Sequence, residues 1–294
     1  MEKQNNTIKR SFGAIYVAMG RPYLAMTLLS IKTLKSVSPS MPVTVITNVE
    51  LLVDNIDFLS EGLDTIIFID LDTKENRNIK SRLHEYSSYQ KAVFLDSDTL
   101  IMKDLSVGEF LLDHFDVAMR VNPYPQERKG KGDVPILGGE LVSNLPHWNS
   151  GVILFKKSEA VDHFFSKWNK SYNRIGVEYD QVSLVEAVFK SNVRFLGLEK
   201  RWNDTDPFLN RKKWLKRVRV FHYASNISND LMHQIIAMDS LIPDEGTGEK
   251  NNETAEFISR KRRSKRKELG LLKYSVIKIF WQFSTPVKLH ANLR

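Results

Sequence analysis

The chain has 294 residues, of which 42% are hydrophobic and 27% charged, and it contains no cysteine. This length and balance exclude a disordered chain and allow one large domain or two small ones. The lack of cysteine excludes disulfides, thiolate metal sites and cysteine nucleophiles. The net charge of +8 is uneven, because residues 260–294 carry +10 and the preceding part of the chain carries −2. The body of the chain is therefore not basic enough to predict a nucleic-acid-binding domain.

Short apolar segments alternate with helical patterns along the body of the chain. Residues 13–19 form a continuous apolar run, which is typical of a buried parallel strand. Residues 23–37 follow Pro22 and carry apolar residues at helical spacing. Further strands are predicted at 41–47, 64–70, 91–96, 115–120, 151–155, 193–198 and 217–223, and further helices at 162–168 and 180–189. This alternation predicts an α/β fold with a mostly parallel central sheet flanked by helices.

The composition changes after residue 243. We predict one domain over 1–243, a polar and then basic linker over 244–267, and an amphipathic helical tail over 268–294. The apolar part of the tail, 269–283, would rise only about 22 Å as a helix, which is too short to cross a bilayer. With its basic neighbours it is expected to bind an anionic membrane surface. A helix docked on the domain and an RNA-binding arm are the alternatives. Because no signal sequence or spanning segment is evident, we expect a cytoplasmic protein on the inner face of a membrane.

Two aspartates end the predicted strand at 91–96. Asp96 and Asp98 are two residues apart, so on a strand their carboxylates would point to the same side. They would lie at the carboxyl end of the strand, where open α/β sheets bind their ligands. Two adjacent carboxylates are costly unless a cation neutralises them, so they are candidate ligands of a divalent metal. The alternative is a turn with two solvated acids.

His222 ends another predicted strand and is a candidate third ligand. An imidazole added to two carboxylates favours Mn²⁺ over Ca²⁺. A histidine in a purely structural role is the alternative interpretation.

Two further polar segments suit a shaped pocket. Asn149 and Ser150 precede Gly151, whose missing side chain would let the backbone approach a ligand closely. Asp180 and Gln181 begin a predicted helix. Simple turn chemistry for Asn149 and helix capping for Asp180 are the alternatives.

Taken in order, these segments resemble those of one enzyme family, the GT-A fold glycosyltransferases of family 8, whose retaining members include glycogenin and bacterial lipopolysaccharide galactosyltransferases. The matching pieces are Tyr-Val-Ala at 16–18, Ser-Ser-Tyr-Gln-Lys at 87–91 leading into Phe-Leu-Asp-Ser-Asp at 94–98, Trp-Asn-Ser-Gly at 148–151, Tyr-Asp-Gln at 179–181 and Phe-His-Tyr at 221–223. Each piece is weak by itself, but the five in this order are specific. The resemblance covers about three quarters of the chain, from Gly13 to Ser225.

The resemblance implies a role for each matching position. Asp96, Asp98 and His222 would hold Mn²⁺ or Mg²⁺, with Asp96 also reaching the ribose of a nucleotide-sugar. Asp180 and Gln181 would act at the sugar carbon as catalytic residues. The residues implied to bind the donor are Tyr16, Val17, Ala18, Arg82, Lys91, Asp96, Ser97, Asn149, Ser150 and Gly151. The implied reaction transfers a hexose from a UDP-sugar or related donor to a glycan or a lipid-linked acceptor, with retention of configuration.

One departure concerns the cation that would hold the leaving diphosphate. The segment after His222 is Tyr-Ala-Ser in place of a glycine- and lysine-containing one, so this cation has to come from elsewhere in the chain. Lys212, Lys213 and Lys216, in a basic segment over 201–216, are the candidates. Two other functions stay open: a nucleotidyltransferase, which would show a glycine-rich first loop that this chain lacks, and a non-catalytic nucleotide-sugar-binding protein attached to a membrane by its tail.

Overall fold

The structure, a computed structural model of the chain, describes residues 11–49, 63–122, 136–175, 180–205, 217–224, 226–242 and 253–268. The strands are β1 (Phe12–Ala18), β2 (Val43–Thr47), β3 (Thr65–Phe68), β4 (Lys91–Leu95), β5 (Thr99–Ile101), β6 (Val117–Asn122), β7 (Ile136–Leu137), β8 (Glu140–Leu141), β9 (His147–Lys156), β10 (Phe195–Leu198) and β11 (Val220–His222). The helices are α1 (Arg21–Val37), α3 (Asn76–Lys80), α4 (Leu83–Tyr86), α5 (Val107–His114), α6 (Glu159–Ile175), α7 (Gln181–Phe189), α9 (Asn229–Asp239) and α10 (Glu253–Glu268). Short 3₁₀ turns lie at Thr73–Glu75, Val142–Asn144 and Lys200–Trp202.

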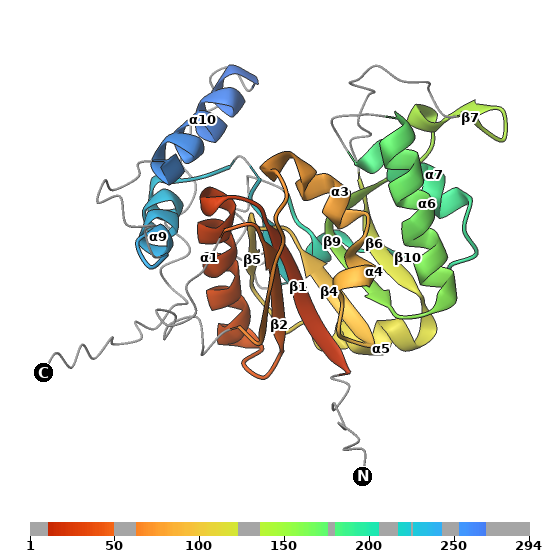
Figure 1. Cartoon of the computed structure of the whole chain (residues 1–294), viewed down its shortest axis with the longest axis horizontal. Helices are drawn as coiled ribbons and strands as arrows, with labels where there is room; N and C mark the ends of the chain where they lie inside the picture. Colours follow the sequence, from red (N-terminus) through yellow and green to blue (C-terminus); the bar gives the residue numbers. More distant parts are fainter. Residues whose placement is uncertain are drawn as a thin grey trace, which may run out of the picture.

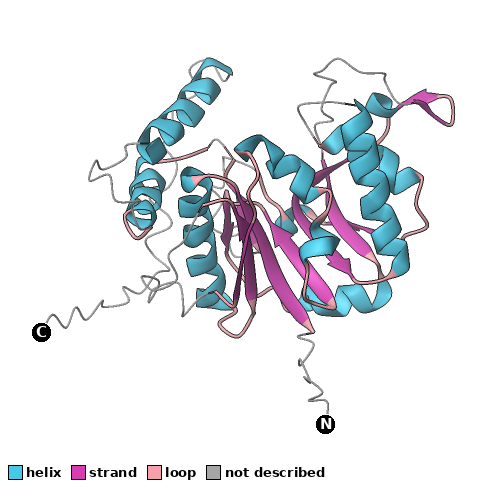
Figure 2. Ribbon diagram, in the orientation of Figure 1, coloured by secondary structure: helices cyan, strands magenta, loops and turns pink. Residues whose placement is uncertain are grey.

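A seven-stranded sheet forms the centre of the fold, in the order β10-β6-β9-β4-β1-β2-β3 (Figures 1 and 2). β9 runs antiparallel to both of its neighbours, and the other adjacent strands are parallel. The predicted α/β fold with a mostly parallel sheet is therefore confirmed. The strand predicted at 217–223 lies outside this sheet, because β11 pairs antiparallel with β5, a short strand that the sequence pattern did not predict.

Helices cover both faces of the sheet, and the two faces have separate cores (Figure 2). Alternate residues of β1 point to opposite faces of the sheet. Ala14 and Tyr16 pack in the core on the side of α1, whereas Ile15 and Val17 pack in the core on the side of α6 and α7. Burial on both faces explains why β1 is a continuous apolar run with no polar alternation. β1 and β4 are paired in parallel, so both end at the same edge of the sheet, next to the start of α1.

The C-terminal part of the described chain corrects the predicted linker over 244–267. Residues 253–268 form the helix α10, which packs against α1 and α9. Ile258 is fully buried in the α1 core, and the Thr254 hydroxyl donates a hydrogen bond to Asp239 at 2.7 Å. Residues 244–252 and nearly all of the predicted tail, 269–294, lie outside the described residues, so the membrane contact of the tail stays a prediction. Among the described helices, none is both long and apolar enough to cross a bilayer.

Candidate functional site

Asp96 and Asp98 lie in the turn that joins β4 to β5, directly after β4 ends at Leu95. Hydrogen bonds from both sides hold Asp96 in this turn. The backbone N–H of Asp96 donates to the carbonyl of Gly151 at 2.9 Å, and the Thr99 hydroxyl donates to the carbonyl of Asp96 at 2.7 Å. The acidic pair is thus fixed to the carboxyl end of the central strand.

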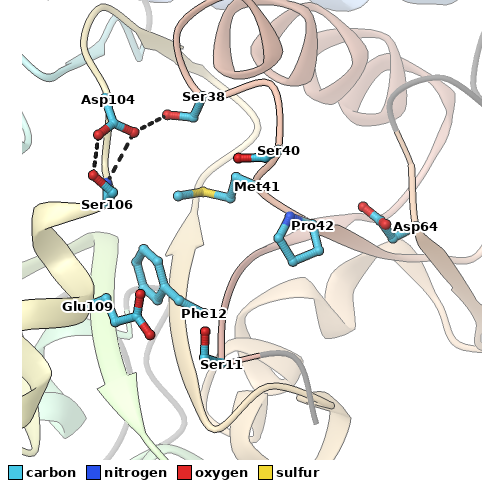
Figure 3. Close-up of a pocket in the computed structure, with 10 residues that line it drawn as sticks. All are labelled: Ser11, Phe12, Ser38, Ser40, Met41, Pro42, Asp64, Asp104, Ser106 and Glu109. Atoms are coloured by element: carbon cyan, nitrogen blue, oxygen red, sulfur yellow. Dashed lines mark hydrogen bonds between the residues drawn. The ribbon is translucent and has the colours of Figure 1, made fainter. Parts of the chain in front are cut away.

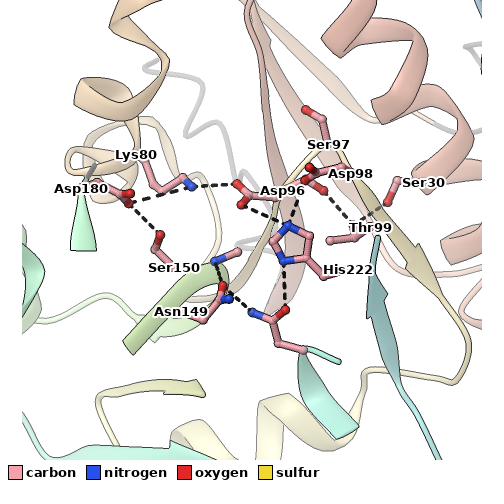
Figure 4. Close-up of polar contacts among 12 residues, drawn as sticks. Ser30, Lys80, Asp96, Ser97, Asp98, Thr99, Asn149, Ser150, Asp180 and His222 are labelled. Carbon is pink, nitrogen blue, oxygen red and sulfur yellow. Dashed lines mark hydrogen bonds and ion pairs between the residues drawn. The ribbon is translucent and has the colours of Figure 1, made fainter. Parts of the chain in front are cut away.

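Ser97, between the two acids, points the other way. Its hydroxyl accepts a hydrogen bond from Thr27 at 2.9 Å and donates one to the carbonyl of Val17 at 3.1 Å. Asp96 and Asp98, on either side of it in the turn, both have carboxylate oxygens near the ring of His222 (Figure 4). The structure therefore uses the Ser97 hydroxyl to anchor the turn in the core, although the family resemblance implied a donor contact for it.

His222 completes the cluster from a distant part of the sequence. It stands opposite Thr99 in the β5–β11 pair, and its Nε2 lies 3.1 Å from Asp98 Oδ1 and 3.9 Å from Asp96 Oδ2 (Figure 4). One ligand atom from each of the three residues lies within 4.8 Å of the other two. The predicted convergence of Asp96, Asp98 and His222 is therefore confirmed.

The other nitrogen of His222 is held by a residue that the sequence reasoning missed. Nδ1 donates to the side-chain oxygen of Asn203 at 3.0 Å, and the amide of Asn203 donates to Asn149 at 2.9 Å. With Nδ1 engaged in this way, Nε2 is the nitrogen that faces the carboxylates, which is the arrangement that metal-binding histidines show. Two carboxylates and an oriented imidazole fit a hard or borderline divalent cation such as Mn²⁺ or Mg²⁺. No local pattern marks Asn203, because its role depends on a contact across 19 residues of sequence.

Lys80 is a second residue that the sequence reasoning missed. Its Nζ lies 2.8 Å from Asp96 Oδ1 and 4.0 Å from Asp180 Oδ2, and its side chain is only 9% exposed (Figure 4). Burial by itself would lower the pKa of Lys80, but the carboxylates of Asp96 and Asp180 outweigh it and raise the pKa above its ordinary value. Asp180 also accepts a hydrogen bond from Ser150 at 2.7 Å. Lys80 therefore links the acidic pair to a second polar group formed by Ser150 and Asp180.

Asp98 and His222 shift each other's pKa. Burial by itself would raise the pKa of Asp98, but His222 and Lys261 hold this pKa far below its ordinary value. Burial would lower the pKa of His222, but Asp98 and then Asp96 raise it. The carboxylate of Asp98 and the protonated imidazole of His222 thus stabilise each other, and a metal ion bound at Nε2 would have to displace that proton.

Asn149 and Gly151 occupy a strand, and the Asn149 side-chain oxygen accepts a hydrogen bond from the backbone N–H of Gly151 at 2.9 Å, which is the local side-chain contact of the turn chemistry considered as the alternative. Both lie within β9, where the pairing with β6 shifts register between Met119 and Arg120. Such an irregularity changes the direction of the side chains around it. The side of Gly151 that would carry a Cβ faces His222, whose ring atoms Cε1 and Nδ1 would lie 2.5 Å from that Cβ. The space that we expected Gly151 to leave for a ligand is thus filled by the ring of His222.

Asp180 and Gln181 stand at the start of α7, as predicted. The Asp180 side chain makes no capping hydrogen bond to the helix, so the capping alternative is not what the structure shows. Gln181 is 9% exposed, and its side-chain oxygen accepts a hydrogen bond from Asn122 at 2.8 Å. Of these two residues, Asp180 lies in the polar network around Lys80.

Two of the predicted donor-binding cations lie elsewhere. Lys91 begins β4, at the opposite end of the strand from the acids, and its Nζ pairs with Asp113 at 2.6 Å. Arg82 pairs with Glu85 on the surface. Arg82 and Lys91 were the cations expected to reach the donor, but the cation that the structure places next to Asp96 is Lys80. The other candidate cations, Lys212, Lys213 and Lys216, lie outside the described residues.

Three residues of β1 that the resemblance implies to bind the donor have their side chains inside the protein. Tyr16, Val17 and Ala18 are all buried, and the Tyr16 hydroxyl is 3.0 Å from that of Ser30. Burial raises the pKa of Tyr16 above its ordinary value. A ligand at this end of β1 could therefore reach only the backbone of these three residues.

A separate pocket lies at the amino-terminal edge of the sheet, next to the starts of β1 and β2 (Figure 3). Its volume is about 460 Å³. Two of its three acids are engaged by the fold: Asp104 accepts hydrogen bonds from Ser38 and Ser106, and Asp64 accepts one from the backbone N–H of Val43. Among the described residues that line it there is no Lys, Arg or His, so it offers no cation to a phosphate. The cluster around Asp96 is the stronger candidate site.

No protein-family model and no curated protein matches the sequence. Solved structures do share the fold. The galactosyltransferase LgtC, solved with donor and acceptor sugar analogues, superposes with a TM-score of 0.52 at 15% identity, over 80% of this chain and 98% of LgtC. The bifunctional glycosyltransferase WbbM gives 0.53 at 16% identity, over 81% of this chain and 51% of WbbM. The glycosyltransferase GlyE of Streptococcus pneumoniae TIGR4 gives 0.51 at 15% identity, over 85% of this chain and 64% of GlyE. The chain therefore has the GT-A-like fold that the resemblance implied.

Proposed function

We propose that the chain is a metal-dependent glycosyltransferase that moves a hexose from a nucleotide-sugar, UDP-linked in the simplest case, to a glycan or lipid-linked acceptor. The observation that carries the proposal is the convergence of Asp96, Asp98 and His222 at the carboxyl end of β4. This is the edge at which an α/β sheet binds its ligand. The likeness in fold to solved glycosyltransferases supports the choice of reaction over other uses of an acidic pair.

In this proposal the cluster holds the donor by its diphosphate. A divalent cation bound there would stabilise the negative charge that develops as the nucleoside diphosphate leaves. Asn203 fixes the imidazole of His222, and Lys80 fixes the carboxylate of Asp96, so the ligands are in place before the donor arrives. Preorganised ligands of this kind do not have to reorganise during the reaction.

The sugar would be bound beside this cluster by the second polar group. Asp180 accepts a hydrogen bond from Ser150 and lies 4.0 Å from Nζ of Lys80, next to the proposed donor site. A carboxylate there can stabilise the positive charge on the sugar carbon as the glycosidic bond breaks, as in glycoside hydrolysis. We propose this role for Asp180, supported by Gln181, and a hydrogen-bonding role toward the sugar for Asn149 and Ser150. The acceptor hydroxyl would attack on the face from which the diphosphate leaves, with the leaving phosphate as base, which retains the configuration.

Ligand-dependent thermal stability tests the proposal. The full chain is heated with MnCl₂ and a panel of UDP- and GDP-sugars, and the same panel is repeated with Asp98→Asn. A bound ligand at 100 times its Kd stabilises a protein by about 2.7 kcal/mol. We expect stabilisation that requires both Mn²⁺ and a nucleotide-sugar and that Asp98→Asn abolishes. Asp113→Asn is the matched control, because Asp113 pairs with Lys91 at the other end of β4.

The outcomes separate the proposal from its rivals. Stabilisation that is equal in Asp98→Asn would contradict it. Stronger stabilisation by nucleoside triphosphates would favour a nucleotidyltransferase, and binding without transfer to any acceptor would favour a non-catalytic binding protein. Where transfer is found, NMR of the product decides the stereochemistry: an α-linked product from an α-donor is expected, and a β-linked product would exclude retention.

The membrane contact proposed for residues 268–294 has its own test. Flotation with anionic liposomes compares the full chain with a chain that ends at Glu268, which keeps α10 on the domain. Loss of flotation in the shorter chain is expected, and equal flotation would contradict the assignment.

A further inference from the structure

The helix α10 carries a strongly basic sequence to the edge of the candidate site. It lies beside the start of α1, at the end of the sheet where β1 and β4 end (Figure 1). One aromatic and one aliphatic side chain hold the helix there. Phe257 packs edge-on against Tyr23 with 5.1 Å between ring centroids, and Ile258 is fully buried. The helix is therefore a docked part of the fold, and its position relative to the acids is set by packing.

Lys261 is the cation that this docking turns into the site. It follows Phe257 by four residues and Ile258 by three, so it lies on the same face of α10. Its Nζ is 3.5 Å from Asp98 Oδ2 and 5.3 Å from the ring centroids of both Tyr23 and Phe257. Its side chain is 23% exposed, whereas the neighbouring Arg260 is 76% exposed and pairs with Glu256 on the outer face.

Asp98 thus has a cationic partner on each oxygen, with His222 on Oδ1 and Lys261 on Oδ2. A divalent cation held by Asp98 would take over the neutralisation of this carboxylate, and like-charge repulsion would then disfavour the contact with Lys261. The ammonium group sits on a flexible four-carbon stem, so it can turn to a new anionic partner without moving α10.

The charge balance of the site shows which partner that would be. Three carboxylates, of Asp96, Asp98 and Asp180, face two ammonium groups, of Lys80 and Lys261, and the imidazolium of His222, so the formal charges of the metal-free site cancel. A divalent cation bound by a neutral imidazole turns this into one positive charge. That positive charge suits a polyanionic ligand and would be absent without Lys261.

We propose that Lys261 is a second cationic contact for the diphosphate of the donor, supplied by α10 and exchanged from Asp98 to phosphate when the metal binds. This inference rests on the proposed function. It gives α10 a part in the donor site in addition to its packing role. The cation that would hold the leaving diphosphate would then lie about forty residues beyond His222 in the sequence.

Binding measurements on the full chain test the assignment without requiring turnover. The affinity for Mn²⁺ alone is measured first, and then the affinity for UDP, and separately for GDP, at saturating Mn²⁺. The variants are Lys261→Ala, Lys261→Arg and the control Arg260→Ala. In Lys261→Ala we expect nucleotide affinity to fall by about tenfold or more, the effect of losing a charge-assisted hydrogen bond. Affinity for Mn²⁺ alone should stay equal or rise, because a competing positive charge is gone.

The controls decide between a phosphate contact and a simple block of the metal site. Lys261→Arg keeps the charge, so its affinity for the nucleotide should stay within a few-fold of that of the unmodified chain. Arg260→Ala should bind both Mn²⁺ and the nucleotide as tightly as the unmodified chain does. If Lys261→Ala binds both Mn²⁺ and the nucleotide more tightly, the lysine only obstructs the site and the inference is overturned. Equal nucleotide affinity in Lys261→Ala overturns it too. If the unmodified chain binds neither nucleotide, the proposed function itself fails, and the inference with it.

Discussion

The imidazole of His222 lies directly against the backbone of Gly151. A Cβ at position 151 would stand 2.5 Å from two atoms of the ring and 3.0 Å from Asp96 Oδ2. No side chain larger than hydrogen fits without displacing the ring, so the geometry of the candidate metal site depends on this glycine.

Gly151→Ala is therefore expected to push His222 out of the cluster. We expect affinity for Mn²⁺ to fall by roughly tenfold or more, and stability to fall by about 1–3 kcal/mol because the site becomes overpacked. Isothermal titration with MnCl₂ and urea denaturation measure the two effects. Gly197→Ala is the matched control, because a Cβ there would make only an ordinary contact with Val121 at 3.8 Å. Unchanged Mn²⁺ affinity in Gly151→Ala would mean that His222 does not bind the metal.

Asn203 orients His222 and should influence metal affinity without touching the metal. Asn203→Ala removes the hydrogen-bond acceptor for Nδ1 of His222. Residues that hold a metal-binding histidine in this way typically contribute about 10–100-fold to metal affinity. We expect a loss of that size for Mn²⁺. Asn203→Asp keeps an acceptor for Nδ1 and should recover most of the affinity. An equal loss in both variants would show that Asn203 acts only through packing.

Lys80 is expected to stabilise the fold by neutralising the carboxylates around it. Lys80→Met leaves Asp96 and Asp180 without their shared cation, and removing one partner of a buried pair costs about 3 kcal/mol. Urea denaturation at pH 7 measures the loss. Lys91→Met should cost less than about 1 kcal/mol, because its partner Asp113 is exposed. Added Mn²⁺ should restore part of the stability that Lys80→Met loses. If Lys80→Met loses no more stability than Lys91→Met, Lys80 does not stabilise the fold by neutralising these carboxylates.

The raised pKa of His222 gives the site a defined pH dependence. Because Asp98 raises this pKa in the folded protein, the pair stabilises the metal-free fold fully below the unfolded value of about 6.5 and loses that contribution as pH rises through the folded value. Asp98→Asn should therefore destabilise the metal-free protein more at pH 6 than at pH 9. In an NMR titration the pKa of His222 should drop in this variant, since burial then dominates.

The same titration contains its own control. Burial lowers the pKa of His147, which lies away from Asp98 and should not respond to Asp98→Asn. Protons also compete with the metal for His222, so affinity for Mn²⁺ is expected to increase with pH across the titration of the imidazole. A pH-independent Mn²⁺ affinity would contradict the assignment of His222 as a ligand.

Local sequence patterns were sufficient to predict the site residues that directly follow apolar strands. Asp96, Asp98 and His222 could be predicted as a group because each follows a short apolar run, and the carboxyl ends of strands in an α/β fold gather at one edge. The same reasoning predicted the positions of the main strands along the chain, including β1 and β4. It did not reveal β5, a three-residue strand in a polar turn region, although β5 is the strand that brings His222 to the acids.

The sequence by itself therefore determined the α/β architecture and the acid and imidazole ligand types, because apolar periodicity and strand-end chemistry are properties of neighbouring residues. Only the tertiary structure decided what surrounds these ligands. Lys80 comes from the last turn of a short helix, Asn203 from the end of a 3₁₀ turn, and Lys261 from a helix whose basic sequence alone predicted a linker. Their places depend on how separate elements pack together, and packing joins positions that no local spacing connects.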